Sequence, residues 1–283
     1  MLSDVFWVVT ATHFRNYYYF LVYFIRILFY TGERKYFGGI NMDYNIQGTP
    51  LPVLVFNLAP GETVITERGS MAWRTPNVEM STDGGGIGKM FNRFVSQEGL
   101  MQTSFTAQGS PGMIAFASSF PGSIRGFEVR PGMSIIAQKS SFLAATSGVE
   151  VGVHFNKKLG AGFFGGEGFI MQKFSGQGMV FVELDGFAVD YTLNAGQQLV
   201  LDTGHLVAMS DTCSIDIERN KGVKNVLFGG AGLFNTVITG PGTVVLQTMP
   251  SISVANSLAP YFSNNSSGGN SGLAGAVVDG LFQ

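Results

Sequence analysis

The chain repeats itself at a fixed spacing, and this repeat constrains the fold more than any local motif does. Seven residues recur unchanged 64 positions further along. They are Phe164, Gly165, Gly166, Gly168, Gly176, Gly178 and Val180. A more divergent third copy lies upstream, in residues 98–116. Self-similarity at a period of this length is typical of repeat architectures, so we predict three related units.

The composition indicates that these units are made of β-strands. The 283 residues include 39 glycines, and many short apolar segments lie between them with no long segment of helical period. Each copy begins with a turn at Gly61, Gly132 or Gly196, where a type II turn requires a positive φ. One such unit cannot cover its own apolar face. We therefore expect an all-β domain in residues 42–250, with three units of about 44–120, 121–184 and 185–250. They would stack around a pseudo-threefold axis in a β-helix- or β-roll-like body.

The first 41 residues differ from the rest, because they hold 13 of the 36 aromatic residues. Arg15 and Arg26 enclose only ten uncharged positions, whereas a transmembrane helix needs about 20 apolar residues. A signal peptide would need a basic start and a small-residue cleavage site. The segment is either an aromatic interfacial anchor or a mis-called start, with translation beginning at Met42. We favour the mis-called start and expect residues 1–41 to lie off the β body.

The charges and the single cysteine indicate a soluble protein in a reducing compartment. Without residues 1–41, the 17 basic and 19 acidic residues fall to 13 and 17, a net charge of −4. No long basic run is present, so nucleic acid is not an expected partner. Cys213 is the only cysteine, which excludes an internal disulfide. We expect a cytoplasmic protein whose residues 251–283 form a flexible tail rich in Ser, Gly and Asn.

Several motifs resemble one known family in order and spacing. They are Pro60-Gly61-Glu62, Gln138-Lys139, residues 165–169, residues 202–208 and residues 239–242. Over about residues 44–250, the chain is similar to the family of altered-inheritance-of-mitochondria protein 24. The resemblance implies a three-repeat β fold, similar in its strands to the tryptophan RNA-binding attenuation protein. It implies no catalytic activity or agreed ligand. Fungal members associate with the mitochondrial inner membrane, but nothing here resembles a transit peptide.

The sequence contains no recognisable catalytic or cofactor-binding constellation. His154 and His205 have no other histidine nearby, whereas metal sites of the cupin type need clustered ligands. No Gly-x-Ser-x-Gly elbow occurs, and residues 84–89 lack the Walker pattern. We therefore predict no catalytic residue, no cofactor and no metal. The chain is not expected to be an enzyme.

Three acidic residues, Glu79, Glu150 and Asp216, occupy equivalent positions in the repeats. A threefold axis would gather them into a site for a hard cation. The alternative is that each is the solvent-facing member of an alternating strand. We favour the alternative, because strand alternation predicts such residues without any ligand.

The connector that precedes each repeat hairpin carries basic residues beside apolar ones. Their recurrence at one place in each unit predicts a cationic, aromatic face at one end of the body. Such a face binds membranes by apolar insertion and by attraction to anionic headgroups. The predicted face comprises Lys157, Lys158, Phe163, Phe164, Lys221, Lys224 and Phe228. The alternative is that the phenylalanines are buried and the lysine heads extend into water.

These patterns favour a non-enzymatic binding or scaffolding protein, peripheral to the inner face of a membrane. The expected partners are an anionic membrane surface, another protein or further copies of the chain. Two other classes remain as alternatives. One is a β-barrel enzyme that binds a metal or small ligand. The other is an RNA-binding module, an analogy at the level of fold that the acidic body opposes.

Overall fold

The computed structural model describes residues 35–37, 40–67, 69–81, 102–157, 168–219 and 234–263. In this part of the chain nearly every element is a β-strand, as predicted. The strands are β1 (Lys35–Phe37), β2 (Ile40–Gln47), β3 (Val53–Leu58), β4 (Thr63–Thr66), β5 (Met71–Arg74), β6 (Val78–Ser81), β7 (Thr103–Ala107), β8 (Gly112–Ala117), β9 (Gly122–Val129), β10 (Ile135–Gln138), β11 (Phe142–Thr146), β12 (Val149–Lys157), β13 (Phe169–Gly176), β14 (Gly178–Asp185), β15 (Ala188–Leu193), β16 (Gln198–Asp202), β17 (Leu206–Ser210), β18 (Ser214–Arg219), β19 (Phe234–Thr239) and β20 (Gly242–Gln247). Short 3-10 turns, η2 (Lys139–Ser141) and η4 (Thr203–His205), follow β10 and β16, and one α-helix, α3 (Ser251–Ser263), follows β20.

The same strand pairing occurs in three successive segments, β3–β8, β9–β14 and β15–β20, which we call units one, two and three. In each unit the sixth strand pairs with the first and third, and the fifth pairs with the second and fourth. A bulge interrupts the ladder between the third and sixth strands at one equivalent point. It lies between Met71 and Trp73, between Phe142 and Ala144, and between Leu206 and Ala208. The turn glycines Gly61, Gly132 and Gly196 all have positive φ, as predicted.

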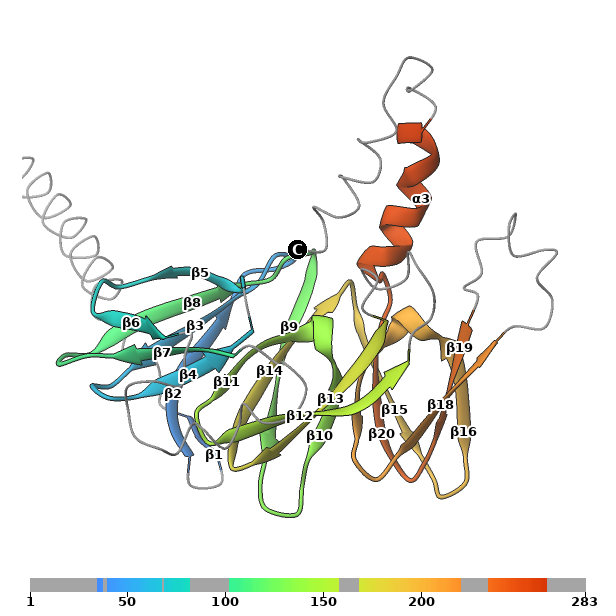
Figure 1. Ribbon diagram of the computed structural model, residues 1–283, viewed down its shortest axis with the longest axis horizontal. Coiled ribbons are helices and arrows are strands. Elements are labelled where there is room, and N and C mark those ends of the chain that lie inside the picture. The colour runs from blue at the N-terminus through green and yellow to red at the C-terminus, as the bar shows by residue number, and fades with distance from the viewer. Residues whose placement is uncertain are drawn as a thin grey trace, which may run out of the picture.

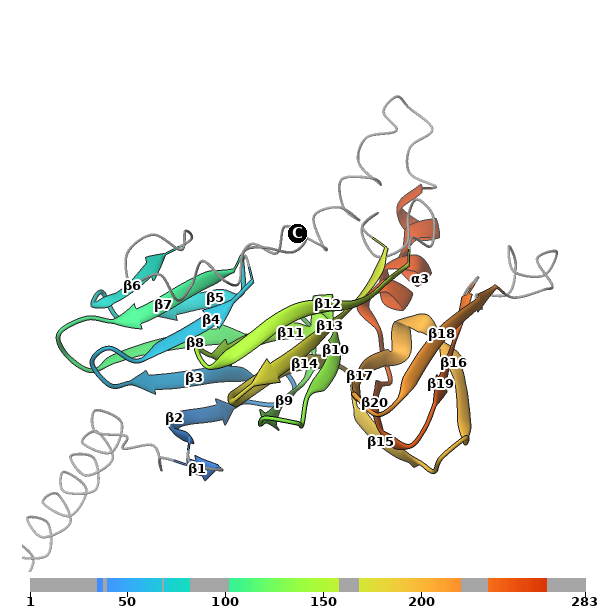
Figure 2. The same ribbon diagram turned by 60° about the horizontal axis from the view of Figure 1, so that its bottom comes forward.

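Two further ladders join the units into a row (Figures 1 and 2). Strand β4 pairs with β11, and β10 pairs with β17. Each ladder completes a six-stranded sheet from three strands of one unit and three of the next. A five-stranded sheet, β1-β2-β3-β8-β5, and a three-stranded sheet, β16-β19-β18, remain at the two ends of the row. Among the described residues, ladders join neighbouring units only. The pseudo-threefold axis and the likeness to the tryptophan-attenuation protein therefore stay predictions.

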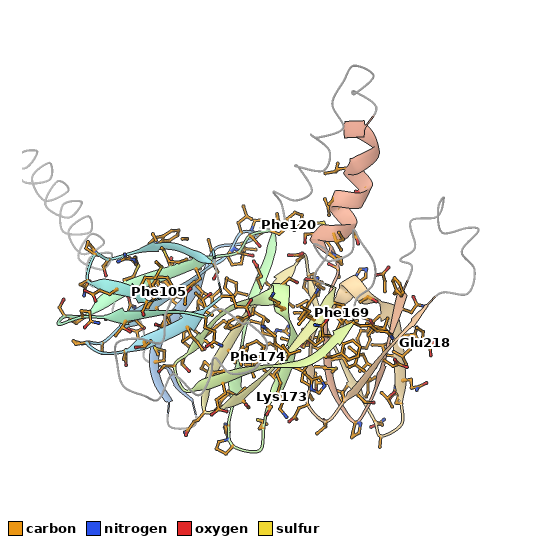
Figure 3. The ribbon with its side chains drawn as sticks, viewed as in Figure 1. Phe105, Phe120, Phe169, Lys173, Phe174 and Glu218 are labelled. Atoms are coloured by element: carbon orange, nitrogen blue, oxygen red, sulfur yellow. The ribbon has the colours of Figure 1, made fainter. Side chains whose placement is uncertain are left out.

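Three hydrophobic cores lie along the row, and each takes side chains from a neighbouring unit. Phe181 of unit two belongs to the first core, with Phe56 and Phe116. Ile65 of unit one belongs to the second core, and Ile136 of unit two to the third. The labelled Phe105, Phe174 and Phe169 belong to the first, second and third cores (Figure 3). Because each core combines side chains from more than one unit, the units are expected to unfold together.

Regular structure extends beyond residues 42–250 at both ends of the β body. Residues 35–37 and 40–41 belong to the hairpin of β1 and β2, and β2 pairs with β3. In the described ladders, residues 35–37 and 40–41 pair only with one another and with Met42, and β2 pairs with β3 from Asp43 onward. The expectation that residues 1–41 lie off the body therefore stays a prediction. Residues 1–34 and 38–39 lie outside the described ranges.

At the other end, residues 251–263 form the helix α3 where a flexible tail was predicted. The backbone N–H of Ser251 donates to Asp185 Oδ2 at 2.8 Å, so a tertiary contact caps the helix where its own sequence offers no acidic cap. Residues 264–283 lie outside the described ranges. Within the part of the chain that the structure describes, no helix has the length and apolar character to cross a membrane.

Gly168, which immediately precedes β13, has a φ of +93°, a conformation that L side chains rarely adopt. The sequence predicted this requirement. We expect Gly168→Val to lower the free energy of unfolding by about 1–3 kcal/mol, as measured by chemical denaturation. Gly152→Val is the matched control, because a Cβ at Gly152 meets nothing within 4 Å. Equal stabilities of the two variants would show that the positive φ is not required.

Candidate functional site: the connector end

The connectors of the predicted cationic face join the fourth and fifth strands of each unit. They comprise residues 82–101, 158–167 and 220–233, all outside the described ranges. The structure therefore places Lys157 but none of Lys158, Phe163, Phe164, Lys221, Lys224 and Phe228. We call the described strand ends that border these segments the connector end. They are the last residues of β6, β12 and β18 and the first residues of β7, β13 and β19.

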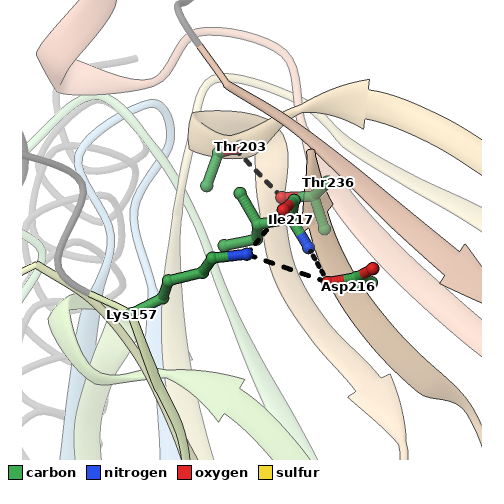
Figure 4. A network of polar contacts seen from close by, with 5 residues as sticks. All are labelled: Lys157, Thr203, Asp216, Ile217 and Thr236. Carbon is green, nitrogen blue, oxygen red and sulfur yellow. Dashed lines mark hydrogen bonds and ion pairs between the residues drawn. The ribbon is translucent and has the colours of Figure 1, made fainter. Parts of the chain in front are cut away.

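Lys157 fastens unit two to unit three at the connector end. It is the last residue of β12, and its Nζ donates to the carbonyl oxygen of Ile217 in β18 at 2.6 Å. The same Nζ lies 3.8 Å from Asp216 Oδ1 (Figure 4). Lys157 ends β12 and Ile217 lies two residues before the end of β18, so this contact joins the ends of the two strands.

The electrostatic attraction between Lys157 and Asp216 is weak, because both side chains face water. Lys157 is 42% exposed and Asp216 is 75% exposed. An ion pair of this kind contributes about 0–1 kcal/mol. The shorter bond to the Ile217 carbonyl is the one that orients the ammonium group.

Buried hydroxyl groups support β19 beside this contact. Thr236 Oγ1 donates to Thr203 Oγ1 at 3.0 Å (Figure 4). Thr203 Oγ1 in turn donates to the Phe234 carbonyl at 3.1 Å. Both threonines are buried. The pair ties η4 to the first residues of β19, so the strand that follows the third connector is held in place.

A buried polar residue recurs at one position of the fifth strand of every unit, and the sequence did not lead us to predict it. Thr103, Gln172 and Thr236 pair with equivalent residues of the second strands and are all buried. Gln172 Nε2 donates to Glu67 of unit one, while Gln172 Oε1 has no hydrogen-bond partner. An uncompensated buried polar atom is costly. The available signal was a polar residue at the same position of this strand in all three copies.

The three equivalent acidic residues do not form a cation site. Glu79, Glu150 and Asp216 are each exposed on their own strands, as the strand alternation predicted. Within the described ranges, no group of three or more His, Cys, Asp or Glu side chains is placed to hold a metal ion.

Neither described histidine is available as part of a cluster of ligands. His154 is exposed on β12, and its pKa is lowered by partial burial and by the Lys173 charge. His205 Nδ1 lies 2.7 Å from the Gln247 carbonyl oxygen. His205 thus has a structural role, connecting η4 to β20.

Two partly buried carboxyl groups hold the junction between the units and α3. Glu183 accepts hydrogen bonds from Ser118 Oγ at 3.0 Å and from the backbone N–H and Oγ of Ser119 at 2.7 and 2.8 Å. Asp185 caps α3 through Ser251. Burial raises the pKa of both carboxyl groups above their ordinary values, and the hydrogen bonds from the serines oppose this shift.

The raised pKa values predict that mild acid stabilises this junction. A carboxyl group whose pKa is higher in the folded state binds more protons when folded, so its stabilising effect is present at low pH and is lost as the pH rises through the folded pKa. As the pH falls from about 7 to the ordinary glutamate pKa of about 4.3, we expect the melting temperature to gain more from protonation in the parent than in Glu183→Gln. Glu79→Gln, at an exposed position, should behave like the parent. An equal rise in parent and Glu183→Gln would contradict the assignment.

Comparison with known proteins establishes the family. The model of the family described as mitochondrial biogenesis AIM24 matches residues 44–249, close to the range predicted from the motifs. The chain belongs to the AIM24 family. The AIM24 match includes all three units and half of β2, and it excludes β1 and α3.

Two relatives of this AIM24 protein come from Streptococcus pyogenes. A protein of serotype M6, described as uncharacterized, is 28% identical over 225 residues, which cover 76% of this chain and 88% of that protein. The X-ray crystal structure of a second protein matches with a TM-score of 0.65 and 25% identity, covering 78% of this chain and 99% of that one. The relatives support the AIM24 fold, and their descriptions name no activity.

Proposed function

We propose that this AIM24 protein is a non-enzymatic binding or scaffolding protein that docks on anionic membranes through its connector end. One observation carries the proposal. The bond from Lys157 to Ile217 joins the strands from which the second and third connectors start. Those connectors contain Lys158, Lys221 and Lys224 together with Phe163, Phe164 and Phe228. The joined strand ends support one surface made by both connectors.

The chemistry of this surface matches an anionic bilayer. Each basic residue near such a surface contributes about 1 kcal/mol of attraction, which fades with salt. Phenylalanine rings add apolar insertion into the interface. The acidic body opposes tight adsorption elsewhere, because it is repelled by the same headgroups. Binding should therefore be weak, oriented and reversible. The protein would act in the cytoplasm, at the inner face of the membrane.

Vesicle co-sedimentation tests the proposal directly. The full chain should pellet with vesicles containing phosphatidylglycerol or cardiolipin at low salt, and much less with phosphatidylcholine alone. Raising the salt to about 0.5 M should release most of the bound protein, because screening shortens the range of the attraction. Equal binding to neutral and anionic vesicles, or none to either, would exclude docking by the lysines.

A further inference from the structure

The two ladders between units follow one rule. Ile65 pairs with Ala145 and Val64 with Thr146 where β4 meets β11. Ile136 pairs with Met209 and Ile135 with Ser210 where β10 meets β17. The turn glycines Gly61, Gly132 and Gly196 set offsets of 71 and 64 residues between units. Adding 71 to the residue numbers of β4 and 64 to those of β11 gives these two pairs of the second ladder. The second strand of each unit thus pairs in one fixed register with the third strand of the next.

In the described structure, this rule leaves one second strand and one third strand without a partner from another unit. The second strand of unit three is β16, and the third strand of unit one is β5; each ends its sheet. They lie at opposite ends of the row (Figures 1 and 2). The five-stranded and three-stranded sheets end at these strands, because no neighbouring unit adds strands to them.

The free edges of β16 and β5 expose apolar side chains at positions where the paired edges bury them. Val200 occupies in unit three the position that Ile65 occupies in unit one and Ile136 in unit two. Ile65 and Ile136 are 2% and 0% exposed, and Val200 is 58% exposed. Ile65 belongs to the core of unit two and Ile136 to the core of unit three. By the same rule, Val200 points toward the core of a following unit.

The opposite edge shows the matching feature. Trp73 occupies in unit one the position that Ala144 occupies in unit two and Ala208 in unit three. Ala144 and Ala208 are fully buried in the core of the preceding unit, whereas Trp73 is 48% exposed. An exposed edge strand with large apolar side chains is a template for pairing with another chain. Trp73 therefore lacks a preceding unit, just as Val200 lacks a following one.

We infer that copies of this chain associate head to tail, with β16 of one copy paired to β5 of the next. The register is fixed by the two internal ladders. Val200 lies opposite Arg74, Leu199 opposite Thr75 and Leu201 opposite Trp73 of the second copy. The three-stranded and five-stranded end sheets then become one continuous sheet, like the two sheets inside the chain. This inference does not depend on membrane docking.

The charged residue of β5 does not prevent this pairing. Arg74 donates to the carbonyl of Val78 in its own chain. In the inferred register it lies diagonal to Asp202 of the second copy, within the reach of an arginine side chain. A head-to-tail contact between two different surfaces closes into a ring or continues as an open array.

Mass measurement across protein concentration tests the inference. The full chain should exceed 30.3 kDa in sedimentation or light scattering as its concentration rises from about 1 to about 100 µM. Val200→Asp and Trp73→Asp should each raise the concentration at half-association by about 30-fold or more, as for a lost hot-spot residue. Phe187→Asp adds the same charge at an exposed position on neither free edge and should associate like the parent.

Mixing the two blocked variants tests the head-to-tail geometry. Val200→Asp retains an intact β5 and Trp73→Asp retains an intact β16, so an equimolar mixture should form a dimer of twice 30.3 kDa. If Trp73→Asp does not fold, Ala72→Asp replaces it, since Ala72 is exposed and faces Asp202 in the inferred register. A monomeric parent at every concentration would overturn the inference. Unchanged association of Val200→Asp, or failure of the mixture to dimerise, would also overturn it.

Discussion

Replacing Phe181 by alanine is expected to lower the free energy of unfolding by about 3–5 kcal/mol. Phe181 is fully buried, and it lies in β14 of unit two while filling the core of unit one. Its ring centroid lies 4.7 Å from that of Tyr44 and 5.3 Å from that of Phe56, both in edge-to-face geometry. The substitution removes these contacts and leaves a cavity between two units.

Denaturant unfolding of Phe181→Ala, followed by two probes, measures this effect and the coupling between units. Trp73 fluorescence reports unit one when Trp7 is replaced by phenylalanine in every protein compared. Far-UV circular dichroism reports the whole β body. Both midpoints should shift together, because unit one depends on a ring from unit two. Phe187→Ala, at a residue that is 73% exposed, should stay within about 0.5 kcal/mol of the parent. A shift in circular dichroism without a shift in Trp73 fluorescence would contradict the shared core.

The repeated sequence predicted the content of each unit well, because local chemistry determines it. The turn glycines must take positive φ, and Gly61, Gly132 and Gly196 do. The same holds for Gly168, at the end of the second connector. Turn positions depend on one or two residues and their steric limits. The all-β class and the boundaries of the strands near these turns could therefore be read from the chain alone.

The arrangement of the units could not be read in this way. A repeat shows that units are related, but the axis or row they form depends on which edges pair. The ladders of β4 with β11 and β10 with β17 produce the row, and each contains only two or three residue pairs. The β-branched residues Ile65, Ile136 and Val200 look alike in sequence. Only the structure shows that two are buried and one is exposed.

The same limit explains the error at the C-terminal end of the body. The polar composition after Pro250 favours a flexible tail, yet the Asp185 carboxylate caps a helix there. Asp185 is distant in sequence, so no local pattern announces the contact. Lys157 is a similar case, since its bond to Ile217 depends on the approach of β18 to β12. The sequence identified Lys157 as part of a cationic face but not its structural role.

That structural role changes the best mutational test of membrane docking. Lys157→Gln would replace the ammonium donor to Ile217 by a shorter, uncharged amide, so a loss of stability could not be separated from a loss of binding. The triple variant Lys158→Gln, Lys221→Gln and Lys224→Gln leaves this bond intact and removes three positive charges. At about 1 kcal/mol per lysine, binding to phosphatidylglycerol vesicles at low salt should weaken roughly 100-fold. Binding to neutral vesicles should not change, because the phenylalanines remain.

A matched control removes three charges from elsewhere on the surface. Arg125, Arg130 and Lys173 form ion pairs with Asp190, Glu128 and Asp211. Exposed ion pairs contribute little to stability, and exchanging these three residues for glutamine lowers the net charge as much as the triple lysine variant does. If the lysines form an oriented surface, the control should retain most of the anionic selectivity and the lysine variant should lose it. Equal losses would mean that net charge alone governs adsorption, and the connector end would then have no special part in binding.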